Sequence, residues 1–145
     1  MGAGGADAAA FSDADLRWMQ QALALADRAR LEDDEIPVGA LLVGADGRLL
    51  AEGWNRNISE SDPSAHAEVE AIRQACRRLD TLDLRNCALY STVEPCMLCG
   101  YVIRRTGIIL VVYGVPAGQA GACTSSYAIL TDSKLEGWPQ VPELT

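Results

Sequence analysis

Short apolar runs alternate with segments of helical periodicity along the chain, and this alternation restricts the fold more than any other feature of the sequence. The predicted strands are 37–43, 48–54, 87–92 and 108–113. The predicted helices are 12–31, 65–79 and 96–105, with a further short helix at 125–131. Strands that alternate with helices pair in parallel through right-handed crossovers, whereas the turn 44–47 joins the first two strands as an antiparallel hairpin. The sequence therefore predicts an α/β fold, a three-layer α-β-α sandwich around a central mixed sheet.

The ends of the chain are less regular than its middle. Residues 1–11 are rich in glycine and alanine and predict a disordered N-terminal tail, which leaves 12–145 as a single domain. From Gly137 onward, two prolines predict an irregular C-terminal tail. The sequence contains no apolar run of about 18 residues and no apolar N-terminal signal, so we expect no membrane span and a cytoplasmic location.

The charge balance is acidic. Lysine and arginine together number 12 against 20 acidic residues, which gives a formal net charge of −8. Proteins that bind nucleic acids usually present a basic face, because contacts with phosphates supply much of their affinity. The only lysine is Lys134, and the paired arginines 77–78 and 104–105 fall in predicted helices, where solvated faces explain them. The charge therefore argues against a nucleic-acid partner.

Two short motifs carry the chemistry. The only histidine stands in His66-Ala67-Glu68, and Pro95-Cys96-Met97-Leu98-Cys99 follows later; each motif lies at the start of a predicted helix. Two cysteines three residues apart on a first helical turn share a face, and the helix N-terminus favours their thiolate forms. A catalytic Zn²⁺ takes three such protein ligands and keeps one position open. His66, Cys96 and Cys99 are therefore the candidate metal ligands, and Glu68 is the candidate group that moves a proton from water to the substrate.

Two other interpretations of the motifs leave residues without a role. A structural zinc site needs a fourth protein ligand, for which Cys123 is available, but Glu68 would then have no function. A redox C-x-x-C pair would leave both His66 and Glu68 unexplained.

Together, these motifs resemble the cytidine deaminase superfamily, in its branch of small single-domain enzymes. The resemblance covers residues 37–113 and includes the order of strands and helices. It implies a five-stranded sheet, a Zn²⁺ cofactor held by His66, Cys96 and Cys99, and Glu68 as proton shuttle. The implied reaction is hydrolytic deamination of an amino-heterocycle with release of ammonia.

Residues before the histidine motif refine the resemblance. The segments 53–56 (GWNR) and 62–68 (DPSAHAE) are similar to bacterial tRNA adenosine deaminases, and related segments occur in guanine and cytosine deaminases. The resemblance implies that Asn55 hydrogen-bonds the substrate base, although a turn residue after a strand is the alternative. We also expect Ala67 to contact the substrate.

The C-terminal region departs from that pattern. The tRNA deaminases carry a lysine-bearing stretch and a basic C-terminal helix, whereas residues 114–145 here contain one lysine and no arginine. The two-aspartate, phenylalanine-bearing tail associated with bacterial guanine deaminases is missing as well. Trp138 is a candidate lid residue over the pocket, with a packed position on the protein surface as the alternative.

These observations predict a zinc hydrolase that deaminates a free base, such as cytosine or guanine, or a nucleoside. The alternative is conversion of adenosine to inosine in tRNA, which the acidic charge and the cation-poor tail oppose. A catalytically silent zinc-binding module is a third possibility, against which an intact Glu68 argues. Relatives of this size are commonly homodimers, and we expect a homodimer formed through the helix that carries Met97 and Tyr101.

Overall fold

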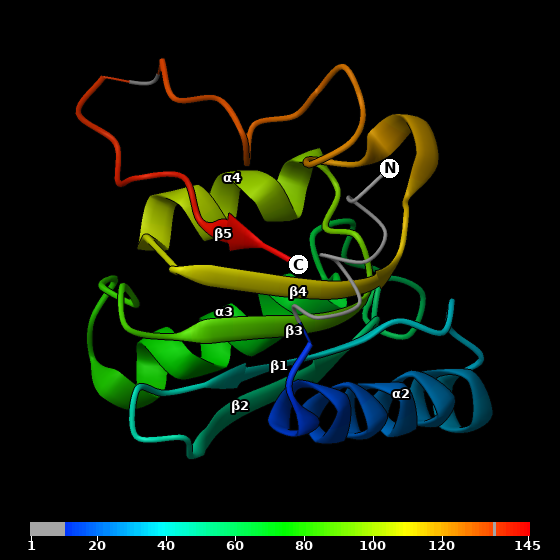
Figure 1. Cartoon of the computed structure of the whole chain (residues 1–145). Coiled ribbons are helices and arrows are strands. Elements are labelled where there is room, and N and C mark those ends of the chain that lie inside the picture. The colour runs from blue at the N-terminus through cyan, green and yellow to red at the C-terminus, as the bar shows by residue number, and fades with distance from the viewer. Residues whose placement is uncertain (1–10, 135) are drawn as a thin grey trace.

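The computed structural model describes residues 11–134 and 136–145, and within them a five-stranded sheet has the order β2-β1-β3-β4-β5 (Figure 1). The elements are α2 (Asp13–Asp33), β1 (Gly39–Val43), β2 (Leu49–Trp54), α3 (Ala67–Leu79), β3 (Ala88–Val93), α4 (Met97–Thr106), β4 (Leu110–Val115), the 3₁₀ turn η1 (Gly118–Ala120) and β5 (Glu143–Leu144). Strand β1 pairs antiparallel with β2 and β3, whereas β3, β4 and β5 pair in parallel. The predicted mixed sheet is confirmed. Apart from Phe11, the predicted disordered tail lies outside the described residues.

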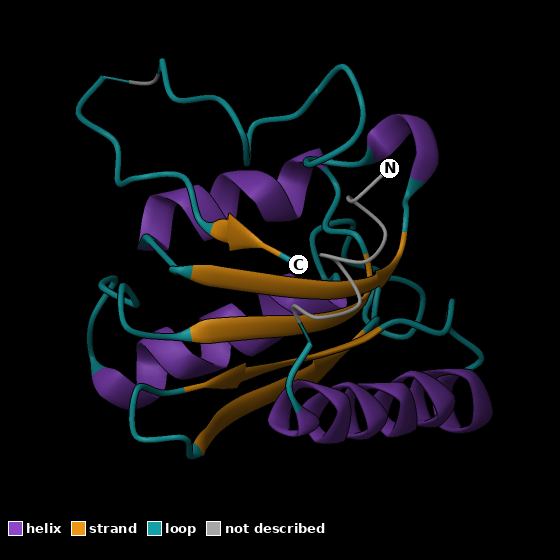
Figure 2. Ribbon diagram, in the orientation of Figure 1, coloured by secondary structure: helices purple, strands orange, loops and turns teal. Residues whose placement is uncertain are grey.

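The sheet is the middle of three layers, with α2 on one face and α3 and α4 on the other (Figure 2). The alternation of side chains along β1 connects the layers. Leu41 packs with Ala22 and Leu25 of α2, whereas Leu42 packs with Ile72 of α3 on the opposite face. All five residues of β1 are buried, as expected for a strand covered on both faces. The predicted α-β-α sandwich is therefore confirmed.

Helix α2 begins at a capping box. The Ser12 hydroxyl accepts a hydrogen bond from the Asp15 backbone N–H, and the Asp15 carboxylate accepts one from the Ser12 N–H, both at 3.0 Å. These contacts satisfy two amide donors that the first turn leaves without helical partners. The helix ends at Asp33, two residues beyond the predicted end, and Asp34 follows in a left-handed conformation.

In the C-terminal region one prediction was wrong, and the predicted irregular tail holds only as far as Pro142. Residues 125–131 form successive turns rather than a helix, and the Ser125 hydroxyl donates to the Gly121 carbonyl and accepts from the Tyr127 N–H. The tail also ends in a strand. The Glu143 N–H donates to the Ile109 carbonyl at 2.8 Å, so that β5 pairs with the edge of β4 that β3 does not occupy. The conformation of residues 125–131 is set by the local hydrogen bonds of Ser125, which compete with a helix. The strand at the end of the tail depends on a pairing partner more than thirty positions away in the sequence.

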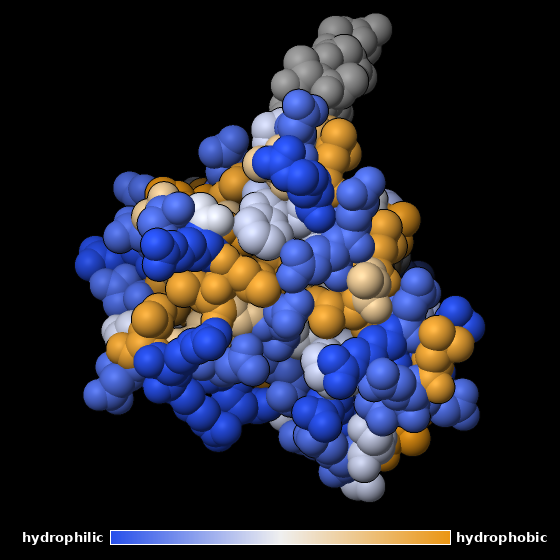
Figure 3. All heavy atoms as spheres, turned by 90° about the horizontal axis from the view of Figure 1, so that it is seen from below, coloured by the Kyte–Doolittle hydropathy of each residue, from blue (hydrophilic) through white to orange (hydrophobic). Residues whose placement is uncertain are grey.

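The remaining surface is mixed in character. Seen from below, from the side of the sheet that ends in β2, hydrophilic side chains are interrupted by apolar patches (Figure 3). Among the described residues, no helix has both the length and the apolar character that crossing a membrane requires.

Candidate active site

The two sequence motifs meet where helices α3 and α4 begin. His66 is the N-cap residue of α3, Cys96 is the N-cap residue of α4, and Cys99 lies in the first turn of α4. Neither N-cap side chain makes a capping hydrogen bond with its own helix. At α3 the side chain of Asn55 does so instead, because its Oδ1 accepts a hydrogen bond from the Ala67 N–H at 3.1 Å. The imidazole of His66 is therefore available to the two thiols.

The three candidate ligands lie within bonding distance of a common point. His66 Nδ1 is 3.4 Å from Sγ of Cys96 and 3.4 Å from Sγ of Cys99, and the two sulfurs are 3.7 Å apart. Among the described residues, these three form a group able to hold a metal ion, and Cys123 is not a member of it. The structure thus offers no support for a fourth protein ligand from Cys123.

These separations match the needs of zinc. Tetrahedral Zn²⁺ with bonds of about 2.3 Å to sulfur and about 2.1 Å to nitrogen places two thiolates about 3.8 Å apart and a thiolate about 3.6 Å from the nitrogen. The observed distances differ from these values by about 0.1–0.2 Å. One imidazole and two thiols are also the donor set of catalytic zinc sites with one open position. The residues present therefore fit Zn²⁺.

The electrostatics of the group favour a bound cation. The hydrogen bond between the two thiol groups, together with the contact to His66, lowers the pKa of Cys96 to about 4. The proton that Cys99 shares with Cys96, together with burial, raises the pKa of Cys99. A divalent cation would take the place of that shared proton.

Glu68 lies two residues beyond His66, in the first turn of α3, and its side chain is 3% exposed. Burial raises the pKa of Glu68 to about 7, although a hydrogen bond with the buried hydroxyl of Ser91 acts in the opposite direction. A carboxyl group with a pKa near neutrality can both accept and donate a proton at physiological pH.

Glu94 is a site element that the sequence analysis missed. Its buried carboxylate accepts hydrogen bonds from the backbone N–H groups of Ala117, Cys123 and Thr124 and from the Thr124 hydroxyl. In addition, the Ala122 N–H donates to the Pro95 carbonyl at 2.8 Å. The segment 117–124 is thus held beside the start of α4. In the sequence Glu94 is a lone acidic residue between a strand that ends at Val93 and Pro95, which is not a recognisable pattern.

Trp138 lies along α4 rather than in the cluster. Its ring packs edge-on against Tyr101 with ring centroids 5.3 Å apart, and it lines a cavity with Gly107, the C-cap residue that follows α4. Cys96 is at the other end of this helix. The predicted lid function has no supporting contact among the described residues and stays a prediction. Ala67, by contrast, lies between His66 and Glu68 with its amide bonded to Asn55.

The zinc-binding region of cytidine and deoxycytidylate deaminases, as a family model, matches residues 12–115. The chain belongs to this deaminase family. The family assignment and the geometry of His66, Cys96 and Cys99 agree on Zn²⁺ as the cofactor of this deaminase. The resemblance to the cytidine deaminase superfamily is confirmed.

Within the family, similarity extends beyond the zinc-binding region. The deaminase is 40% identical to a tRNA-specific adenosine deaminase of Haemophilus influenzae over 124 residues, which cover 86% of this chain and 71% of that protein. A structure from a study of A-to-I editing by tRNA:A34 deaminases superposes with a TM-score of 0.81 and 35% identity, covering 89% of this chain and 95% of that one. A guanine deaminase structure from Bacillus subtilis has a TM-score of 0.66 and 37% identity, covering 69% and 63% of the two chains.

Proposed function

We propose that this deaminase converts adenosine to inosine in tRNA, the alternative that its charge had opposed. The observation that carries this proposal is the extent of the structural agreement. The tRNA:A34 deaminase is matched over 95% of its length at a TM-score of 0.81, whereas the guanine deaminase is matched over 63% at 0.66. The relatives therefore weigh against the expectation, drawn from the acidic charge, that a nucleic-acid substrate is unlikely.

The residues of the site divide the work of such a reaction. His66, Cys96 and Cys99 would hold the Zn²⁺, which when bound supplies a Lewis acid that activates water. Glu68 would take a proton from water and deliver it to the substrate, so that the amino group leaves as ammonia. Asn55 uses its Oδ1 on the Ala67 N–H, which leaves its Nδ2 free to donate to a ring nitrogen of the base.

A second substrate class has its own support. The net charge of −8 and the single lysine in residues 114–145 favour a free base such as guanine or cytosine, or a nucleoside.

A homodimer is also part of the proposal. Met97 and Tyr101 of α4 are 44% and 49% exposed, and burial of these side chains by a second copy would be favourable.

The test is ammonia release by the zinc-loaded protein. The substrates are an RNA anticodon stem-loop with adenosine at the wobble position, the same stem-loop with guanosine there, free guanine, cytosine, adenosine and cytidine. The Glu68→Ala variant is the blank. We expect turnover of the adenosine stem-loop alone, with inosine detected in the RNA. Turnover of a free base or nucleoside, with no reaction on the stem-loop, would establish the small-molecule function instead.

A further inference from the structure

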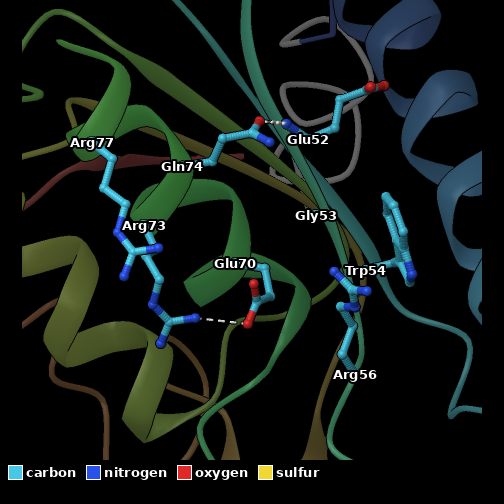
Figure 4. A pocket seen from close by; sticks show the side chains of 8 residues that line it. All are labelled: Glu52, Gly53, Trp54, Arg56, Glu70, Arg73, Gln74 and Arg77. Carbon is cyan, nitrogen blue, oxygen red and sulfur yellow. Dashed lines mark hydrogen bonds and ion pairs between the residues drawn. The ribbon is translucent and has the colours of Figure 1, made fainter. Parts of the chain in front are cut away.

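In an acidic protein that binds RNA, the few cationic side chains must lie close to the phosphate groups of the bound RNA. Three of the arginines line a single cavity of about 270 Å³ between β2 and α3, shown in Figure 4. Arg56 lies two residues beyond the end of β2, and Arg73 and Arg77 project from α3. We call these three residues the arginine cluster. The cavity contains none of the candidate zinc ligands, so it is separate from the active site.

The acidic groups of this cavity leave the arginine cluster with net positive charge. Glu52 extends away from the cluster toward α2, where its carboxylate accepts a hydrogen bond from Gln21 at 3.0 Å (Figure 4). Glu70 pairs with Arg73 at 2.7 Å. Arg77 is exposed, and it forms no ion pair within the described part of the chain.

The existing ion pairs do not prevent the cluster from binding phosphate. Arg56 lies 3.3 Å from Glu60, and the two side chains are 39% and 41% exposed. Pairs this exposed are weak because water and salt screen them. A phosphate offers a guanidinium group the same two-point hydrogen bonding as a carboxylate and carries its charge along a continuous backbone. Exchange of carboxylate for phosphate is therefore feasible at the Arg56–Glu60 pair. The Arg73–Glu70 pair is shorter and less exposed, so Arg73 would add a phosphate contact through guanidinium N–H groups that Glu70 does not use.

The cluster suits a nucleic-acid backbone better than a base. The ring of Trp54, the aromatic residue of this cavity, is already covered by Arg28 at 4.4 Å and by Arg56 at 5.4 Å. Since the cations occupy the aromatic surface, the cavity offers charge and hydrogen-bond donors rather than a free stacking face.

The cluster also begins next to the active site. Arg56 is adjacent to Asn55, whose side chain contacts Ala67. Along α3, Arg73 and Arg77 follow His66 by seven and eleven positions, which is about 10 and about 16 Å at the helical rise of about 1.5 Å per residue. A strand whose target base is in the active site has neighbouring phosphates within such distances.

We propose that Arg56, Arg73 and Arg77 form a phosphate-binding surface that holds the RNA strand beside the active site. This inference rests on the proposed tRNA function, and it names the cations that take the place of a basic C-terminal region. The cluster recognises backbone charge and contributes no base specificity.

The experiment measures binding of a fluorescein-labelled anticodon stem-loop as a function of salt. All proteins carry Glu68→Ala, so that the RNA is not consumed. The test variant is Arg56→Gln/Arg73→Gln/Arg77→Gln. The matched control is Arg30→Gln/Arg48→Gln/Arg85→Gln, which removes the same charge from exposed side chains outside the cluster. Circular dichroism and zinc content establish that each variant is folded and loaded.

We expect the test variant to bind the stem-loop about 100-fold more weakly at 0.1 M salt. Each phosphate contact with a single strand contributes about −0.7 to the slope of log K against log salt, which makes the affinity at 0.1 M about fivefold higher than at 1 M. The loss of three such contacts therefore lowers the affinity by about 100-fold. The plot of log K against log salt should become less steep, with the magnitude of its negative slope smaller by about 2. The control should change affinity less than about threefold, because its charges lie away from the bound strand.

The remaining outcomes separate this inference from the proposed function. Equal weakening in both variants, or an unchanged slope in the test variant, would overturn the arginine cluster while leaving RNA deamination intact. If the Glu68→Ala parent does not bind the stem-loop, and the protein with Glu68 intact turns over a free base instead of the stem-loop, both proposals fail.

Discussion

At the scale of single residues, Glu68 is the group whose loss should stop the chemistry without disturbing the metal. We expect Glu68→Gln to lower the deamination rate by about 10²–10⁴-fold, the usual contribution of a positioned general acid–base group. The amide keeps the shape of the side chain and contacts none of the ligand atoms, so zinc content should stay at the wild-type value. Ammonia release and metal analysis on the same sample test both statements. An activity within tenfold of wild type would exclude Glu68 as the proton shuttle.

Asn55 has two expected functions that substitution can separate. Its Oδ1 caps α3 at the Ala67 N–H, and its Nδ2 is the proposed donor to the base. Asn55→Asp keeps the acceptor and should retain stability, whereas Asn55→Ala should lose about 1 kcal/mol as a removed cap. Both variants lack the donor, so both should raise KM for the substrate. If only the alanine variant raised KM, Asn55 would position α3 without touching the base. Denaturant unfolding and steady-state kinetics provide the two measurements.

Single residues also show what the sequence could reveal about the site. His66, Glu68, Cys96 and Cys99 are recognisable because their chemistry is unusual and their spacing places each at a helix start. Glu94 was missed because a lone carboxylate before a proline has no pattern of its own. Its role depends on the amide groups of residues 117–124, which only the folded chain brings to it.

At the scale of elements, Glu94 joins the end of β3 to the segment 117–124. We expect Glu94→Gln to cost about 3 kcal/mol, because buried hydrogen bonds to a charged group contribute about 1.5–3 kcal/mol each and an amide can replace only part of them. Hydrogen exchange should accelerate in residues 117–131 more than in β1. Thr124→Val removes one hydroxyl donor and should cost less.

Gly121 provides an independent check of the same contact. A Cβ at this position would overlap the Glu94 carboxylate, so Gly121→Ala should resemble Glu94→Gln in both measurements. Unaltered exchange in residues 117–131 of both variants would show that the segment is held by other contacts.

The contact between α2 and β3 should make stability sensitive to acid. The Tyr90 hydroxyl donates to the Asp15 carboxylate at 2.6 Å. Burial opposes ionisation of Asp15, but the bonds from Tyr90 and Ser12 outweigh it and lower the pKa of this carboxyl. A lowered folded-state pKa stabilises the fold above the unfolded-state pKa of about 3.9, and this contribution is lost as the pH falls through the folded-state pKa.

Tyr90→Phe should therefore destabilise the protein at pH 7 and less so at pH 3. Urea unfolding of both proteins at the two pH values measures the difference in unfolding free energy. A difference that is the same at both values would contradict the assigned role of Asp15.

The same scale explains which elements could be predicted. The strands and helices of the middle of the chain were found because each is long enough to show its period, and Leu41 and Leu42 on opposite faces are the signature of a covered strand. Strand β5 has two residues, and its existence depends on the open edge of β4. A segment this short has no period, so only its partner identifies it.

At the scale of the whole molecule, net charge does not indicate where a charged substrate could bind. A value of −8 describes a sum over the chain, whereas binding depends on where the cations lie. Arg56, Arg73 and Arg77 share one cavity although they are separated in sequence by a loop and much of a helix. Composition cannot show this, because the fold decides which charges become neighbours.

The zinc site should also contribute to the stability of the whole fold, since it connects the starts of α3 and α4. In the sequence, His66 is separated from Cys96 by 30 positions and from Cys99 by 33. Only the folded state brings these ligands together, so a bound metal stabilises the folded state. At a free zinc concentration of 1,000 times Kd this amounts to about 4 kcal/mol, or about 10 °C in Tm for a chain of this size.

We therefore expect a chelator to lower the Tm of the zinc-loaded protein by about 10 °C, and added zinc to restore it. Cys99→Ala removes one ligand, so its Tm should already be low and should not respond to the chelator. Differential scanning calorimetry with metal analysis before and after chelation provides the measurement. A protein that loses its zinc at constant Tm would show that the starts of α3 and α4 are held together by packing alone, with Ile72 and Ile103 of the shared core as the residues to examine.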